Sequence, residues 1–185
     1  MRAYETEKTN IAAVDRSIYD IKDAANAAFE VGSGLTPEIV EQISAEKHDP
    51  AWMRDFRLQS LQIYDRTPVQ NWGPDISGLD MRNIVTYVRP NTAMQGKWSD
   101  VPTDIKNTFE RLGIPQAERS GLAGVGAQYD SEVVYHNVRA EVAAQGVVYT
   151  DMESALQGEY AELVRTHFMK LVPPTDHKFA ALHGA

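Results

Sequence analysis

The spacing of apolar residues predicts a helix near the start of the chain. Between residues 11 and 29 the apolar positions alternate at intervals of three and four, which is typical of one buried helix face, and Asn10 is available as the N-cap. The positions are Ile11, Val14, Ile18, Ile21, Ala25 and Phe29. The stretch VGSGLT then ends the pattern.

Two helix starts follow, and together they predict a helical hairpin. Thr36 before Pro37 is a typical N-cap with proline in the first turn, where no backbone N–H is needed. Asp49 before Pro50 repeats the arrangement, so we expect Asp49 to cap the second helix. The expected buried residues are Ile39, Val40 and Ile43 on the first helix and Trp52, Met53, Phe56 and Leu61 on the second.

The rest of the chain alternates short strands with short helices. We expect strands over 83–88, 129–137 and 146–151, and helices over 103–112, 138–145 and 160–168. A short helix should follow Asp151, and a further helical face begins within 177–185. Gly113 and Gly146 would end helices, and Asp151 would cap one. The crossover between the last two strands is shorter than a parallel pair needs, so their pairing stays open. The fold class is a helix-rich α+β domain with a small sheet.

Composition excludes several functions. The 185 residues carry a formal net charge of −8 without a Lys/Arg run, which argues against a nucleic-acid partner. No window has the roughly 20 apolar residues of a membrane helix, and no apolar signal segment opens the chain. There is no cysteine, so disulfides and thiolate metal sites are excluded. We expect a cytoplasmic protein in which Trp52, Trp72 and Trp98 are core or lid residues.

The glycine cluster Gly121, Gly124 and Gly126 raises the question of a phosphate loop. Such a loop runs from a strand through glycines into a helix and carries a Lys followed by Ser or Thr. Here a strand follows the glycines, and Gly126 is followed by Ala127 and Gln128. We therefore expect the glycines to bend the chain into the strand behind them.

Two groups of side chains could carry chemistry. Asp130, Glu132 and His136 share one face of the expected strand, and neighbouring carboxylates there would lie about 6.6 Å apart, a separation that a small hydrolase could use. A solvated outer face explains the same pattern, with Tyr129, Val133 and Tyr135 on the buried face, and we favour it. His167, His177 and His183 with Asp176 lack metal-ligand spacing. We predict neither catalytic, cofactor nor metal residues.

Five collinear blocks resemble one known family. They are GLTPEIVEQIS, WMRDFRLQSL, LAGVGAQYDSEVVYHN, AQGVVYTD and PPTDHKFAALHGA, and GLDMRNIVTYVRP between them is also similar. They resemble the N-terminal part of the SufB/SufD family of iron–sulfur cluster assembly scaffolds. The resemblance implies a variable, helical arm over residues 1–33 and an N-terminal α+β domain over residues 34–185, truncated before the family's β-helix.

The resemblance also implies a function. Family members work with the SufC ATPase, SufD and a sulfur donor protein, and the parent scaffold carries a transient Fe–S cluster. The family's functional cysteine, glutamate and histidine lie in the β-helix, beyond Ala185, so none of their roles transfers to this chain. We expect a non-catalytic domain without a cofactor of its own. A free-standing helical interaction domain is the alternative. Phe179 and Leu182 form an apolar face that we expect to self-associate.

Overall fold

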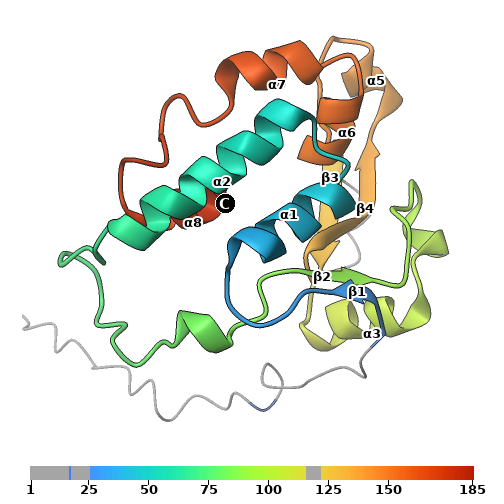
Figure 1. Ribbon diagram of the computed structural model, residues 1–185. Helices are drawn as coiled ribbons and strands as arrows, with labels where there is room; N and C mark the ends of the chain where they lie inside the picture. The colour runs from blue at the N-terminus through green and yellow to red at the C-terminus, as the bar shows by residue number, and fades with distance from the viewer. Residues whose placement is uncertain (1–16, 18–25, 116–121) are drawn as a thin grey trace, which may run out of the picture.

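The computed structural model describes residue 17, residues 26–115 and residues 122–185. Within them lie seven α-helices and two antiparallel two-stranded sheets, which confirms a helix-rich α+β fold. The helices are α1 (Pro37–Glu46), α2 (Ala51–Arg66), α3 (Thr103–Arg111), α5 (Ala140–Ala143), α6 (Met152–Gln157), α7 (Ala161–His167) and α8 (Lys178–Gly184). The strands are β1 (Ala27–Glu30), β2 (Val88–Pro90), β3 (Gly124–Tyr129) and β4 (Glu132–Val138), and two 3-10 turns are η2 (Met81–Asn83) and η3 (Trp98–Asp100). Figure 1 shows α1, α2, α7 and α8 gathered on one side of the molecule and the strands and α3 on the other.

The expected helical hairpin is present as α1 and α2. Thr36 caps α1, because its side-chain oxygen accepts a hydrogen bond from the Ile39 amide at 3.3 Å, and Pro37 opens the first turn. The chain reverses at His48, which has a left-handed φ of 52°. Val40 on α1 and Leu61 on α2 are almost fully buried in one core cluster.

The expected cap of the second helix is wrong. Pro50 occupies the N-cap position of α2, and no side chain caps it. Asp49 turns away from the amides and accepts a hydrogen bond from Arg57 Nε at 2.6 Å. This carboxylate is 2% exposed, so an ion pair with a guanidinium replaces the capping bonds that the sequence suggested.

The last helix folds back onto α2. Ala181 on α8 and Ala185 directly after it are buried, and Ala185 lies in the cluster of Val40 and Leu61. At Gly184 an added Cβ would lie 2.7 Å from Ser60 Oγ, so glycine permits the two helices to approach closely. This part of the α8 surface is thus covered within this chain, and the expected self-association through Phe179 and Leu182 stays a prediction. Phe179 and Leu182 are half-buried beside it.

The first sheet corrects two expectations. Most of the helix expected over 11–29 lies outside the described residues, but Ala27–Glu30 form β1 and pair with β2, so the end of that expectation is wrong. The strand expected over 83–88 begins only at Val88. Both corrections have one cause: residues 26–34 run beside residues 84–91, where the amide of Val31 donates to the carbonyl of Tyr87 at 3.2 Å. Sheet pairing with a distant segment decides both.

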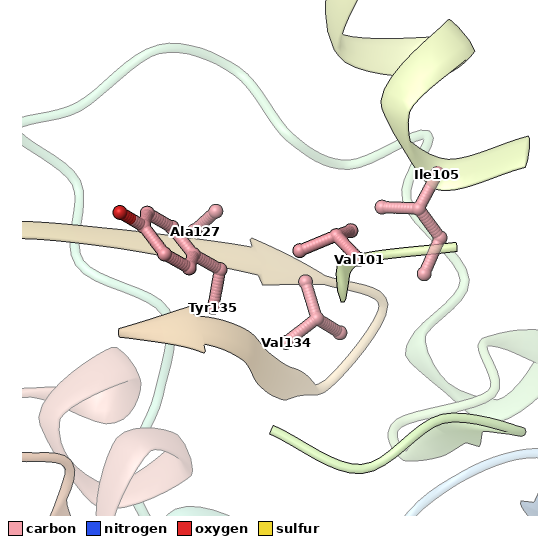
Figure 2. Packing of buried hydrophobic residues seen from close by; sticks show 5 residues of the cluster. All are labelled: Val101, Ile105, Ala127, Val134 and Tyr135. Carbon is pink, nitrogen blue, oxygen red and sulfur yellow. The ribbon is translucent and has the colours of Figure 1, made fainter. Parts of the chain in front are cut away.

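Most of the strand expected over 129–137 is present as β4, but its first residues belong to the end of β3 and to a hairpin turn. Tyr129 ends β3, Asp130 turns the chain with a φ of 52°, and β4 begins at Glu132. Val134 and Tyr135 are successive residues and both are buried, so β4 is covered on both faces. Figure 2 shows these two residues with Ala127 of β3, packed beside Val101 and Ile105. The alternation that we expected, with one solvated face, is wrong here.

Two glycines of the cluster lie inside β3 rather than before it. An added Cβ at Gly126 would lie 2.9 Å from the hydroxyl of Tyr149, and one at Gly124 would lie 3.2 Å from its ring. Their function is to make room for this tyrosine, so the expected bend is wrong. Gly121 lies outside the described residues. The strand expected over 146–151 is wrong. The structure describes these residues as an irregular segment, in which Tyr149 lies against Gly124 and Gly126 of β3.

The remaining helix signals are confirmed. Gly113 and Gly146 follow α3 and α5 with left-handed φ values of 72° and 84°. Asp151 caps α6 by accepting a hydrogen bond from the Ser154 amide at 2.9 Å. In the part of the chain that the structure describes, none of the helices has the length and apolar character needed to cross a membrane.

Candidate functional site

A polar cleft lies where four distant segments meet. It encloses about 450 Å³ between the end of α1, the segment around β2, the turn of the β3–β4 hairpin and the start of α6. Its lining includes five carboxylates and three cations. They are Glu46, Asp49, Glu132, Asp151 and Glu153, and Lys47, Arg57 and Arg89.

Lys47 and Glu132 form the centre of this cleft. Lys47 follows the last turn of α1, and its Nζ lies 2.5 Å from one carboxylate oxygen of Glu132 and 2.6 Å from the other. Both side chains are largely withdrawn from water, with exposed fractions of 18% and 17%. Glu153 on α6 accepts a further hydrogen bond from the same ammonium at 3.1 Å. One cation thus connects α1, β4 and α6.

Tyr87 contacts both Lys47 and Glu132. Its hydroxyl donates a hydrogen bond to Glu132, and Lys47 lies 5.4 Å from the centre of its ring. Burial raises the pKa of Tyr87 strongly, and the hydrogen bond to the Glu132 carboxylate raises it further, because phenolate formation would remove the donor and place two negative charges together. Tyr87 is therefore held as a neutral donor.

The other two cations of the cleft also hold carboxylates. Arg57 binds Asp49 at 2.6 Å, and Arg89 binds Glu46 at 2.7 Å. Each positive charge is thus matched within the protein, and the oxygens of Glu132 are engaged by Lys47 and Tyr87. The arrangement is suited to fastening segments together. Its three cations and Glu132 are already engaged within the protein, whereas a catalytic acid, base or anion-binding group has to be available to its substrate.

The three residues considered for a hydrolase are not brought together. Glu132 lies in the cleft, Asp130 lies in the exposed hairpin turn, and His136 lies four residues further along β4, about 13 Å away. The His136 ring stacks against Tyr149 with ring centres 4.6 Å apart. The solvated role expected for Glu132 is wrong, because its side chain is buried against Lys47 and Tyr87.

The histidines have separate surroundings. His177 caps α8, since its Nδ1 accepts a hydrogen bond from the Ala180 amide at 3.2 Å, and its Nε2 lies 3.7 Å from Asp176. His167 and His183 lie on α7 and α8. The described residues contain no group of three or more His, Asp or Glu side chains that could hold a metal ion.

Two of the tryptophans pack as expected. Trp52 lies edge-on to Phe168, and Trp98 lies edge-on to Tyr135 in the hairpin core. Trp72 is 72% exposed and is therefore not a core residue, and its ring lies edge-on to His177. The sequence did not single out Lys47 or Tyr87. Both contact Glu132, which lies more than 40 positions away in the chain, and such a distant pair leaves no local pattern in the sequence.

Known proteins share this sequence closely. No family model and no solved structure matches the chain. The iron–sulfur cluster assembly protein SufB of Bacillus subtilis is 48% identical over 167 residues, which are 90% of this chain and 36% of that protein. SufBD family proteins of Staphylococcus aureus and Staphylococcus epidermidis are 46% identical over the same shares.

The chain is a homologue of the SufBD family. The match falls in the N-terminal part of these proteins, so the resemblance noted from the sequence is confirmed. The chain spans about a third of the length of the curated SufBD relatives that it matches.

Proposed function

We propose that this chain serves iron–sulfur cluster assembly as the N-terminal domain of a cytoplasmic SufB-like scaffold. The parent scaffold works with SufC, SufD and a sulfur donor protein, and the domain itself is non-catalytic. The 48% identity over 167 residues to a protein named for this process is the observation that carries the proposal.

The side chains of the polar cleft favour a structural role over a catalytic one. Each of the three lysine and arginine side chains of the cleft is paired with a carboxylate, in the Lys47–Glu132, Arg57–Asp49 and Arg89–Glu46 pairs. A chain without cysteine supplies no thiolate to a cluster. The hydrolase alternative gains nothing from the geometry, because Glu132 and His136 lie far apart on β4 and the carboxylate is already engaged.

A chromosomal deletion tests the proposal. Codons 26–185 would be removed in frame in the source organism, and the activity of a [4Fe–4S] dehydratase would be measured beside that of a metal-free dehydrogenase. We expect the dehydratase alone to lose most of its activity and to recover it when the intact gene is returned. Equal activities in the deleted and intact strains would overturn the proposal.

A further inference from the structure

Residues 147–151 connect α5 to α6 without regular structure and lie against β3. We refer to them as the crossing segment. Its middle residue, Tyr149, covers the two glycines of β3 whose added Cβ atoms would meet its ring and its hydroxyl. The outer side of the segment is open to water, since Val147 and Val148 are 50% and 53% exposed. The contacts of Tyr149 therefore hold the middle of the crossing segment on the strand.

Two neighbours of Tyr149 each carry a buried polar atom without a partner. The His136 ring on β4 stacks against the Tyr149 ring, with centres 4.6 Å apart and planes 34° apart, and Asp151 follows Tyr149 by two residues. Within the described part of the chain, neither His136 Nε2 nor Asp151 Oδ2 has a hydrogen-bond partner, and both are shielded from water. An unsatisfied polar atom of this kind costs stability, so two of them beside one ring call for a physical explanation.

The two side chains attract each other when both are charged. Asp151 Oδ1 accepts a hydrogen bond from the Ser154 amide at 2.9 Å, which leaves Oδ2 as the open acceptor. Burial raises the pKa of Asp151, but the hydrogen bonds from Ser154 and the charge of His136 outweigh it and hold the pKa below its ordinary value. A protonated imidazole carries a donor on each ring nitrogen, so it can supply what Oδ2 lacks.

The remaining surroundings of His136 offer it no other charge. Across the hairpin it faces Gly126, and on the other edge of β4 its backbone amide donates to the carbonyl of Gln95. Tyr149 and Asp151 face it from the crossing segment. The charged side chains that follow β4 and Asp151 already have partners: Arg139 pairs with Glu141, and Glu153 pairs with Lys47.

We propose that His136 and Asp151 form a proton-operated latch that fastens the crossing segment onto the β3–β4 hairpin. A proton on His136 supplies both a donor and a positive charge to Asp151, and the imidazolium also attracts the face of the Tyr149 ring. Loss of that proton leaves both buried atoms unsatisfied and loosens the segment. The inference goes beyond the proposed function, since it assigns a conformational equilibrium to two side chains, and it stands whether or not the chain serves cluster assembly.

The pH range of the latch follows from the two groups. The Asp151 carboxyl is charged above a pKa that lies below its ordinary value, and a histidine is ordinarily charged below about pH 6.5. Both charges therefore coexist in mildly acidic solution, at about pH 4.5 to 6. The attraction is lost as the pH rises and the imidazole becomes neutral, so the crossing segment should be tighter at pH 5.5 than at pH 8.

A spin label on the crossing segment tests the proposal in the full chain. The sequence has no cysteine, so Val148→Cys places a single label on an exposed position of the segment. Electron paramagnetic resonance separates mobile from immobile label, and a partly buried ion pair should make the mobile fraction about fivefold smaller at pH 5.5 than at pH 8. Asp151→Asn keeps a capping oxygen but removes the charge, and His136→Phe keeps an aromatic ring beside Tyr149 but removes the titration. Each should abolish the pH dependence.

The matched control is His167→Gln, a change at an exposed histidine on α7. We expect it to leave the pH dependence of the label as in the wild type, and circular dichroism checks that each variant is folded. If Asp151→Asn does not fold, His136→Phe gives an independent measurement. Equal mobile fractions at the two pH values in the wild type would overturn the proposal, as would a pH dependence that survives either change or one that disappears in the control.

Discussion

Lys47 Nζ lies 2.5 Å from Glu132 Oε1, although the two residues are 85 positions apart in the sequence. The contact joins the end of the helical hairpin to the start of β4, and Tyr87 donates to the same carboxylate. The polar cleft is therefore a junction between the two halves of the fold.

Removing one partner of this junction should destabilise the protein. Lys47→Met leaves the Glu132 carboxylate buried without its cation, and we expect a loss of about 2 kcal/mol in the free energy of unfolding, less than for a fully buried pair because some solvent reaches both groups. Urea unfolding measures it. The double variant with Glu132→Gln should lose clearly less than the sum of the single changes, and strict additivity would show that the pair does not interact.

Asp130→Asn is the matched control for that measurement. Asp130 lies two residues before Glu132, is exposed, and has a left-handed φ of 52° that asparagine tolerates well. We expect its free energy of unfolding to stay within about 0.5 kcal/mol of the wild type. A large loss at Asp130 with none at Glu132 would place the important carboxylate in the turn.

Alkaline pH should loosen the fold through Tyr87. Tyrosine is neutral when protonated, and its pKa is raised in the folded protein, first by burial and then by Glu132. Its contribution is therefore complete below the unfolded pKa of about 10 and is lost as pH rises above that value. Urea midpoints at pH 8, 9.5 and 10.5 should fall less steeply for Tyr87→Phe than for the wild type. Parallel pH dependences would contradict this assignment.

The contact between Tyr149 and the glycines of β3 predicts that a side chain at Gly126 will destabilise the fold. A Cβ at Gly126 would lie 2.9 Å from the Tyr149 hydroxyl, so Gly126→Ala should destabilise by about 1 kcal/mol, although alanine is otherwise preferred to glycine in a strand. Adding Tyr149→Phe removes that oxygen and should restore part of the loss. If Gly126→Ala raises the thermal midpoint, the ring does not lie on the strand.

Reconstitution with iron and sulfide should leave this chain colourless. Clusters are held in proteins mainly by thiolates, and the sequence has no cysteine. The measurement is the sulfide-to-iron charge-transfer absorbance after gel filtration, together with iron analysis. A stable band with stoichiometric iron would show that other side chains bind a cluster.

Sequence patterns predicted the helical hairpin well and the sheets poorly. The Thr36–Pro37 start and the Asp151 cap depend on neighbours within four residues, which the sequence displays directly. In contrast, β1 forms because residues near Ala27 pair with residues near Pro90, and an apolar helical spacing was misleading there. Long-range pairing outweighs local preference in such short strands.

The cleft and the glycines illustrate the same limit at single residues. Glu132 was expected to be solvated because alternating polar and apolar residues normally indicate a strand with one face in water. Val134 and Tyr135 are both buried, so both faces of β4 are covered. The function of Gly126 depends on Tyr149, a residue in a segment without regular structure. The sequence gives the identity of each partner but not the distance between them.

Lys178 fixes the end of α2 from the far end of the chain. Its Nζ donates to the backbone carbonyls of Tyr64 and Thr67 at 2.6 and 3.0 Å and lies 3.9 Å from the centre of the Tyr64 ring. Two backbone carbonyls at the C-terminal end of α2 thus acquire this partner only once a residue more than a hundred positions later has been synthesised. During translation α1 can already cover part of α2, but the part that packs against α8 stays exposed until α8 has left the ribosome, and the nascent chain is a natural client for chaperones throughout that interval.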